Sequence, residues 1–284
     1  MIDKFTVVDG HVHTFSTEEI ALRIIESFNK LYDIAFENPG SGSIQDVLTN
    51  MGRIGIDYTV MANFAPPKIL HENNKWAVSV SKNHKCLVPL VSFHPEMEGC
   101  LGSLLEQYIK DGAKGLKIHP MAQGFDPGDR RLDDVYRICD EVSLPIEFHC
   151  GRVANARLNA YADLDMLLPV IDKYRGIPVI LTHMADGNVK DVLSISKKYS
   201  NVYFDTSIVI TGYPPIMNTN EPSWLDDGTV EDIVNEIGAD RVLFGSDYPW
   251  GSPGHDLKRI ISLKLSDNQK ELILGKNAEK LFEI

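Results

Sequence analysis

The strongest constraint on the fold is a series of eight short apolar segments separated by helical patterns. The apolar segments occupy residues 5–9, 57–61, 86–93, 115–120, 145–149, 178–183, 201–205 and 241–247. Each is continuously apolar, which indicates strands buried on both faces, as in parallel sheets. Helical patterns lie at 16–31, 43–54, 101–111, 133–141, 163–174, 188–199, 229–237, 255–265 and 267–282. No element is assigned between 62 and 85.

Alternating strands and helices predict βαβ units, which belong to the α/β class. Eight such units in 284 residues fit a closed (β/α)8 TIM barrel, whose usual length is about 250 residues. We therefore expect one domain over 1–284, with the active site at the C-terminal ends of the strands. A doubly wound open sheet is the alternative, but no G-x-G-x-x-G motif follows any strand.

Composition and charge narrow the class of partner. Apolar residues make up 43% of the chain and charged residues 24%, which is typical of a globular protein. The formal charge of −12 disfavours nucleic acid and anionic membranes, because phosphate demands the opposite sign. No apolar run approaches the roughly 20 residues of a membrane span, and the N-terminus shows no leader pattern. The four cysteines show no C-x-x-C spacing and are interpreted as free thiols. We expect a cytoplasmic protein that acts on a small molecule.

Metal-binding residue types stand at the ends of the predicted strands. His11 and His13 close the first strand, and because side chains alternate along a strand they share one face. Such a pair is suited to a metal ion. The later strands end in His119, His149, His183, Asp205 and Asp247. Since the ends of barrel strands converge, this pattern predicts one metal-dependent active site.

Five motifs surround these residues: D-G-H-V-H at 9–13, G-L-K-I-H-P at 115–120, E-F-H-C-G at 147–151, L-T-H-M at 181–184 and F-G-S-D-Y-P at 244–249. The chain ends with G-K-N-A-E-K-L-F at 275–282. Together they resemble the amidohydrolase superfamily, and in particular its amidohydrolase-related branch (amidohydrolase family 2). That branch includes metal-dependent hydrolases and non-oxidative decarboxylases, and the resemblance spans essentially the whole chain.

The resemblance implies one divalent metal ion, zinc or alternatively manganese, on His11, His13, His149 and Asp247. Asp247 would also take a proton from water, and His183 would contact the substrate or polarise its reacting carbonyl. Three neutral imidazoles and one carboxylate suit zinc and leave room for a water, whose pKa the metal lowers towards about 7. A core histidine bonded to backbone is the alternative interpretation of both His149 and His183.

Several residues are candidates for binding substrate. Related branches carry a carbamylated lysine that bridges two metals near the position of Lys117, but here the resemblance implies one metal, with Lys117 and His119 lining the pocket. Lys117 could bind a substrate carboxylate, and its modification is left open. Arg152 and Arg157 follow the fifth strand, where a guanidinium can clamp a carboxylate; the alternative is a solvated surface pair. Trp250 could wall an apolar or aromatic substrate.

Two features stay open between a structural and a functional role. Asp205 suits either role equally, and the Pro/Gly/Asn-rich segment 207–228 is a candidate lid. Barrels of this superfamily often pair, so a homodimer is compatible with the resemblance.

The leading hypothesis is a metal-dependent hydrolase that acts on a small ester, lactone or amide-like substrate. The alternative is a metal-dependent decarboxylase, a carboxy-lyase that acts on a small carboxylic acid, for example an aromatic one. The metal ligands do not distinguish the two reactions, because both enzymes would use the same set. A TatD-like or PHP-like phosphohydrolase is disfavoured by His119, where those sites carry glutamate. A metal-binding scaffold without turnover ranks last, since all expected ligands are present. The substrate and the native metal are not determined by the sequence.

Overall fold

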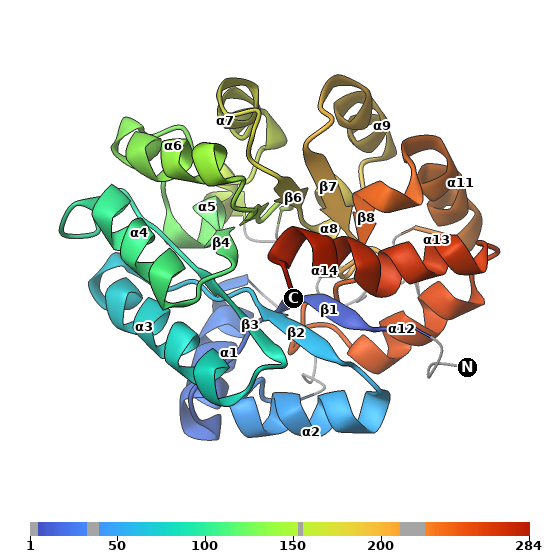
Figure 1. Ribbon diagram of the computed structural model, residues 1–284, viewed down its shortest axis with the longest axis horizontal. Coiled ribbons are helices and arrows are strands. Elements are labelled where there is room, and N and C mark those ends of the chain that lie inside the picture. The colour runs from blue at the N-terminus through green and yellow to red at the C-terminus, as the bar shows by residue number, and fades with distance from the viewer. Residues whose placement is uncertain (1–4, 33–39, 153–155, 211–224) are drawn as a thin grey trace.

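Eight parallel strands form one continuous sheet in the order β1 to β8, with helices around its outside (Figure 1). The computed structural model describes residues 5–32, 40–152, 156–210 and 225–284. The strands are β1 (Val8–Val12), β2 (Tyr58–Met61), β3 (Leu87–Val91), β4 (Gly115–Ile118), β5 (Ile146–Phe148), β6 (Val179–Leu181), β7 (Val202–Asp205) and β8 (Val242–Leu243). All eight predicted strands are present, and the predicted (β/α)8 barrel is confirmed.

Backbone hydrogen bonds between β1 and the residues after β8 close the barrel. The Gly10 amide donates to the Phe244 carbonyl at 2.9 Å, and the Asp247 amide donates to the His11 carbonyl at 2.8 Å. A Cβ at Gly10 would lie 2.9 Å from the Phe244 oxygen, so the absence of a side chain allows this approach. The closure therefore places the end of β1 directly beside the loop after β8.

Most helices of the described residues pack around the outside of the barrel (Figure 1). The described helices are α1 (Glu18–Tyr32), α2 (Ile44–Ile54), α3 (Pro67–Asn83), α4 (Leu101–Asp111), α5 (Pro120–Gln123), α6 (Asp133–Val142), α7 (Leu168–Lys173), α8 (His183–Asp186), α9 (Val189–Lys198), α11 (Asp227–Ile237), α12 (Pro253–Ser262), α13 (Asp267–Glu271) and α14 (Asn277–Phe282). Short 3-10 turns occupy Ala156–Tyr161 and Leu164–Met166, and a π turn, Leu272–Lys276, joins α13 to α14. None of the described helices is long and apolar enough to cross a membrane.

Helix α3 lies in the stretch to which the sequence analysis assigned no element. Its buried face includes Leu70, Ala77 and Val78, but the stripe is interrupted by Asn74, which is fully buried. The Asn74 amide donates to the Ser92 carbonyl at 2.8 Å and accepts from the Ser92 amide at 3.0 Å. A polar residue thus occupies a core position because it binds backbone at the end of β3, and this hides the helical period of apolar residues.

The end of the barrel opposite the strand C-termini is filled by apolar side chains and covered by α14. Val8, Val60, Val88, Ile180 and Leu243 form one buried cluster with residues of that helix. In Figure 1, α14 lies close to β1 at the centre of the view. The apolar core is thus concentrated at one end, and polar side chains are left to the C-terminal ends of the strands. Of the candidate lid, residues 211–224 lie outside the described residues.

Candidate metal centre

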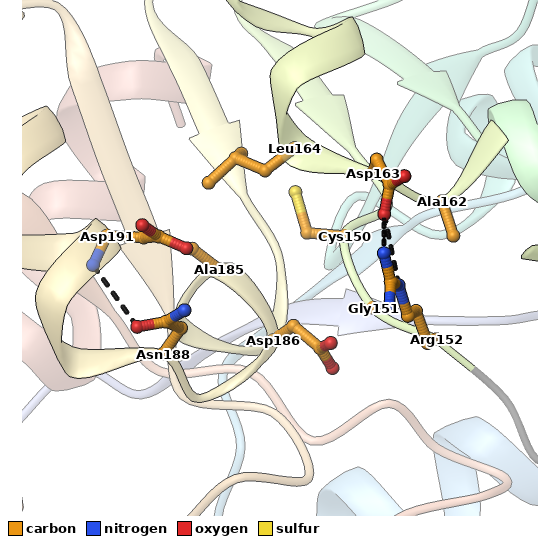
Figure 2. Close-up of a pocket in the computed structure, with 10 residues that line it drawn as sticks. All are labelled: Cys150, Gly151, Arg152, Ala162, Asp163, Leu164, Ala185, Asp186, Asn188 and Asp191. Carbon is orange, nitrogen blue, oxygen red and sulfur yellow. Dashed lines mark hydrogen bonds and ion pairs between the residues drawn. The ribbon is translucent and has the colours of Figure 1, made fainter.

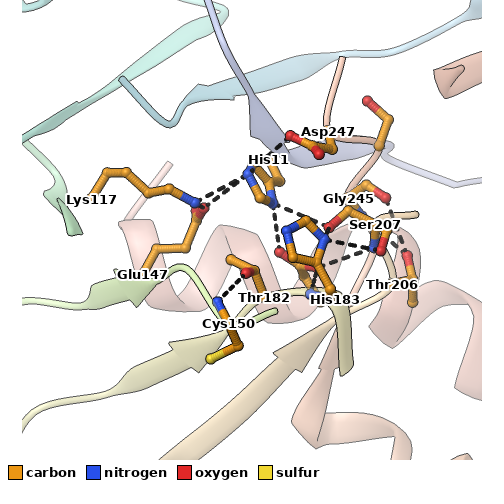
Figure 3. Close-up of polar contacts among 12 residues, drawn as sticks. His11, Lys117, Glu147, Cys150, Thr182, His183, Thr206, Ser207, Gly245 and Asp247 are labelled. Atoms are coloured by element: carbon orange, nitrogen blue, oxygen red, sulfur yellow. Dashed lines mark hydrogen bonds and ion pairs between the residues drawn. The ribbon is translucent and has the colours of Figure 1, made fainter. Parts of the chain in front are cut away.

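His11, His13 and Asp247 meet at the C-terminal mouth of the barrel; Figure 3 shows His11 beside Asp247. His13 Nε2 lies 3.0 Å and His11 Nε2 lies 3.4 Å from Asp247 Oδ1. One potential ligand atom from each of the three residues lies within 4.8 Å of the others. Burial raises the pKa of Asp247, but the electrostatic interaction with His11 and the hydrogen bond with His13 outweigh it and lower this pKa to about 2. Asp247 is therefore a carboxylate at neutral pH.

Asp205 orients the His11 ring. Its Oδ2 lies 2.9 Å from His11 Nδ1, and because a carboxylate only accepts, Nδ1 carries the proton. The lone pair of His11 is then on Nε2, the atom that faces Asp247. Burial opposes the charge on Asp205, but His11 holds the pKa of this carboxyl far below its usual range. A carboxylate behind a ligand histidine is the common way to fix the tautomer of that ligand.

His149 lies outside the cluster of His11, His13 and Asp247. Its ring stacks on His119 with centroids 3.7 Å apart and meets His183 edge-on at 5.1 Å. Its Nε2 atom is buried and has no hydrogen-bond partner in the described part of the chain. Burial lowers the pKa of His149 well below its usual value, so the ring is neutral. An unpartnered nitrogen of this kind is available to a metal ion.

His183 begins a left-handed turn after β6. Its φ is 56°, and Met184, Ala185 and Asp186 continue with φ values of 48°, 51° and 62°. Residues other than glycine rarely adopt this region, and each costs about 1–2 kcal/mol. The His183 amide donates to Asp205 Oδ1 at 2.8 Å, while its Nδ1 lies 2.8 Å from Ser207 Oγ. The turn is thus held by hydrogen bonds to the end of β7.

Lys117 and Glu147 form a fully buried ion pair inside the barrel (Figure 3). They are register partners on β4 and β5, and Lys117 Nζ lies 2.5 Å from Glu147 Oε1. Lys117 Nζ also lies 3.1 Å from His11 Nε2. Neither side chain is exposed to solvent. The predicted contact between Lys117 and a substrate carboxylate would therefore require the ammonium group to leave Glu147.

His119 and Trp250 line the mouth of the site. His119 Nδ1 accepts a hydrogen bond from the Ala122 amide at 3.2 Å, so in the neutral ring the proton is on Nε2. The His119 ring lies against Phe64 with centroids 4.5 Å apart. Trp250 meets His13 edge-on at 5.4 Å, and its Nε1 donates to Asn29 on α1 at 3.0 Å. Aromatic side chains therefore flank the histidines.

Arg152 lines a polar cavity of about 280 Å³ together with Cys150 and Ala185 (Figure 2). Its Nε donates to Asp163 Oδ1 at 3.0 Å, and the side chain is 61% exposed. Asp186 and Asp191 also line the cavity. The guanidinium is thus engaged by a carboxylate of the chain itself. The side chain of Arg157 lies outside the described residues.

The donor set fits a divalent transition metal. It offers the imidazoles of His11 and His13, the Asp247 carboxylate and the Nε2 atom of His149, which has no partner among the described residues. Zinc and manganese accept ligands of these types. Carboxylate support behind His11 adds to this fit.

Glu147 and Ser207 belong to the site but were not among the residues predicted from the sequence. Glu147 stands two residues before His149 and is a charged residue inside an apolar segment, which is a signal of a buried partner. Ser207 follows Asp205 by two residues, and its amide donates to Asp205 Oδ1 at 3.0 Å. An aspartate followed two residues later by serine at a strand end is a pattern for such a turn.

Comparison with known proteins gives a family model, a curated sequence relative and similar solved structures. A family model described as amidohydrolase matches residues 8–284. The gamma-resorcylate decarboxylase of a Polaromonas species is 28% identical over 122 residues, which are 40% of this chain. The match spans only 37% of the length of that relative.

Solved structures match over nearly the whole chain. The 5-carboxyvanillate decarboxylase of Novosphingobium aromaticivorans, solved with manganese and 3-methoxy-4-hydroxy-5-nitrobenzoic acid, has a TM-score of 0.73 and 14% identity over 99% of this chain and 97% of that one. A candidate 2-pyrone-4,6-dicarboxylic acid hydrolase from Pseudomonas putida has a TM-score of 0.69 and 18% identity over 98% of both chains. At these identities the likeness shows the barrel fold.

Proposed function

The chain belongs to the amidohydrolase family, and from this premise we propose that it is a hydrolase that uses one divalent metal ion to cleave a small ester, lactone or amide-like substrate. The observation that carries the proposal is the meeting of His11, His13 and Asp247 at the mouth of the barrel. Asp247 is ionised at neutral pH, which is the protonation state that a general base requires.

His11, His13, His149 and Asp247 would hold the metal, with zinc or manganese as the ion. When bound, such an ion polarises a substrate oxygen and acidifies water. The protein contributes ligands in the right protonation state: Asp205 keeps the lone pair of His11 on Nε2, and burial keeps His149 neutral. The wall of Phe64 and Trp250 suits a flat or apolar substrate body.

Asp247, His119 and His183 would each have a separate role in the reaction. Asp247 accepts the proton of the attacking water and returns it to the leaving group. His119 presents Nε2–H, which can stabilise negative charge on the substrate oxygen, the role first predicted for His183. The Nδ1 atom of His183 faces oxygens of Ser207, so its Nε2 offers a lone pair to the attacking water.

The first test is metal content measured by plasma mass spectrometry on protein purified without chelator. We expect about one zinc or manganese per chain, lost in His149→Ala and Asp247→Ala. His255→Ala is the matched control, because this exposed histidine on α12 lies away from the site. Two metals per chain would refute the single-ion assignment. Full metal content in Asp247→Ala would show that Asp247 is not a metal ligand.

The metal-loaded protein is then screened against lactones, amides and esters, with and without a carboxylate group. Products formed in water enriched in ¹⁸O should carry the label, because hydrolysis places a water oxygen in the acid product. Turnover that survives complete removal of the metal would contradict the proposal.

Decarboxylation is the second candidate, and the observation that favours it is the sequence match to a gamma-resorcylate decarboxylase. In that reaction a carbon–carbon bond breaks, CO₂ leaves, and the ring carbon takes a proton. A panel of hydroxybenzoates labelled with ¹³C in the carboxyl group distinguishes the candidates. Labelled CO₂ would support the lyase, and ¹⁸O in the product would support the hydrolase.

A further inference from the structure

Asp205 and Ser207 connect His11 to His183 through hydrogen bonds. Figure 3 shows Ser207 beside the two histidines. Asp205 Oδ2 accepts from His11 Nδ1 at 2.9 Å. Asp205 Oδ1 accepts from the amides of His183 and Ser207 at 2.8 and 3.0 Å. It also accepts the Ser207 hydroxyl at 2.5 Å. Both oxygens of this buried carboxylate are therefore occupied by donors.

The contacts of the Ser207 hydroxyl determine the direction of each of its hydrogen bonds. A serine hydroxyl has one proton to donate and two lone pairs to accept with. Its proton goes to Asp205, because a carboxylate can only accept. Its oxygen lies 2.8 Å from His183 Nδ1 and 3.2 Å from His11 Nδ1. The His183 contact must therefore be an N–H donor to the serine oxygen, and the longer His11 contact is a second branch of the N–H that Asp205 accepts.

A contact with the backbone also places the proton of His183 on Nδ1. Its Nδ1 also lies 3.2 Å from the carbonyl oxygen of Ser207, which is an acceptor only. A lone pair on Nδ1 would face two oxygens at once. The neutral ring must therefore carry its proton on Nδ1 and its lone pair on Nε2.

We propose that Ser207 and Asp205 are positioning residues that hold His11 and His183 in the same tautomer, so that one ring offers Nε2 to the metal and the other offers Nε2 to the reacting water. The roles of the two rings rest on the proposed function, whereas the tautomers rest on the hydrogen bonds alone. The contact between Asp205 and the His183 amide also holds the left-handed turn, so ring and backbone of His183 are fixed by the same carboxylate.

The direct test is a long-range ¹H–¹⁵N correlation spectrum of metal-free protein labelled with ¹⁵N-histidine. The nine histidines give separate patterns for the two tautomers, and His183→Gln identifies the signal of His183. We expect the Nδ1–H pattern for His183. The Nε2–H pattern for this ring would overturn the proposal, whatever the enzyme turns out to catalyse.

Variants then separate positioning from general stability. Ser207→Ala leaves the Ser207 carbonyl as the one remaining acceptor for His183, so kcat should fall about tenfold, the value of one hydrogen bond. KM should stay within about twofold and metal content should not change. Ser207→Thr keeps the hydroxyl and should restore kcat. Thr206→Val is the control, because that buried hydroxyl contacts Gly245 and neither histidine.

Asp205→Asn tests the His11 branch of the network. An amide nitrogen cannot accept from Nδ1–H, so we expect the metal affinity to fall about 10–100-fold in chelator competition. Unchanged affinity in Asp205→Asn, or equal losses of kcat in Ser207→Ala and Thr206→Val, would refute the positioning role. If the spectrum shows Nδ1–H but no substrate is turned over, the proposed function fails and the tautomer assignment stands.

Discussion

Lys117→Met leaves the Glu147 carboxylate buried without its cation, and we expect the free energy of unfolding to fall by about 3–5 kcal/mol. Both side chains are fully buried and their charged atoms lie 2.5 Å apart. At this distance, with an effective dielectric constant of about 20, the attraction is about 7 kcal/mol before desolvation offsets part of it. The single variant loses the attraction but keeps the desolvated carboxylate, whose Oε2 already lacks a partner among the described residues.

Urea and thermal unfolding of the metal-free protein measure this loss. For a chain of this size about 2 °C accompanies each kcal/mol, so the melting temperature should drop by roughly 6–10 °C. The double variant Lys117→Met/Glu147→Leu removes both charges and should return to within about 1 kcal/mol of wild type. Lys75→Met, from the exposed pair with Glu72, is the control and should change little. A loss below about 1 kcal/mol in Lys117→Met would refute the buried pair.

Three further predictions concern the metal centre. Lys117→Met should raise the affinity for zinc about tenfold or more in chelator competition, because it removes a positive charge 3.1 Å from His11 Nε2. A fall in affinity would instead indicate a carbamylated, metal-bridging lysine. Gly245→Ala places a Cβ 3.0 Å from His11 Cβ, so zinc affinity should fall about 10–100-fold. Gly52→Ala is the control and should leave zinc affinity unchanged, because its Cβ would meet no atom within 4 Å. Because the pKa of Asp247 is lowered to about 2, its contribution to stability, about 2 kcal/mol, is present above pH 4 and should be lost as the pH falls towards 2. Thermal unfolding of the metal-free protein across this range measures the loss, and Asp247→Asn should flatten the curve; an equal acid dependence in wild type and variant would contradict this assignment.

The strands and their terminal residues could be predicted because both depend on local pattern. A continuously apolar segment followed by histidine or aspartate indicates a buried strand and its C-terminal end, and this pattern does not depend on distant residues. This identified the ends of β1, β5, β6 and β8 and the meeting of His11, His13 and Asp247. Helix α3 was missed because Asn74, a polar residue at a core position, hides its period.

Side-chain partners across strands were decided by the tertiary structure. Lys117 was predicted to face the substrate, yet register with Glu147 on β5 places its ammonium in a buried pair. Arg152 was predicted to clamp a substrate carboxylate, yet the chain supplies Asp163 to its guanidinium. Ser207 gains its importance from two histidines that lie 24 and 196 positions away along the chain.

The sequence by itself therefore determined the class of fold, the end of the barrel that carries the site and the residue types gathered there. Those features follow from periodicity and from the order of strands and helices. Only the tertiary structure decided which histidine nitrogen carries a proton, which cation is already paired and which ring nitrogen lacks a hydrogen-bond partner in the described part of the chain. These depend on distances of about 3 Å between residues on different strands, which are set by barrel closure and register rather than by neighbours in the chain.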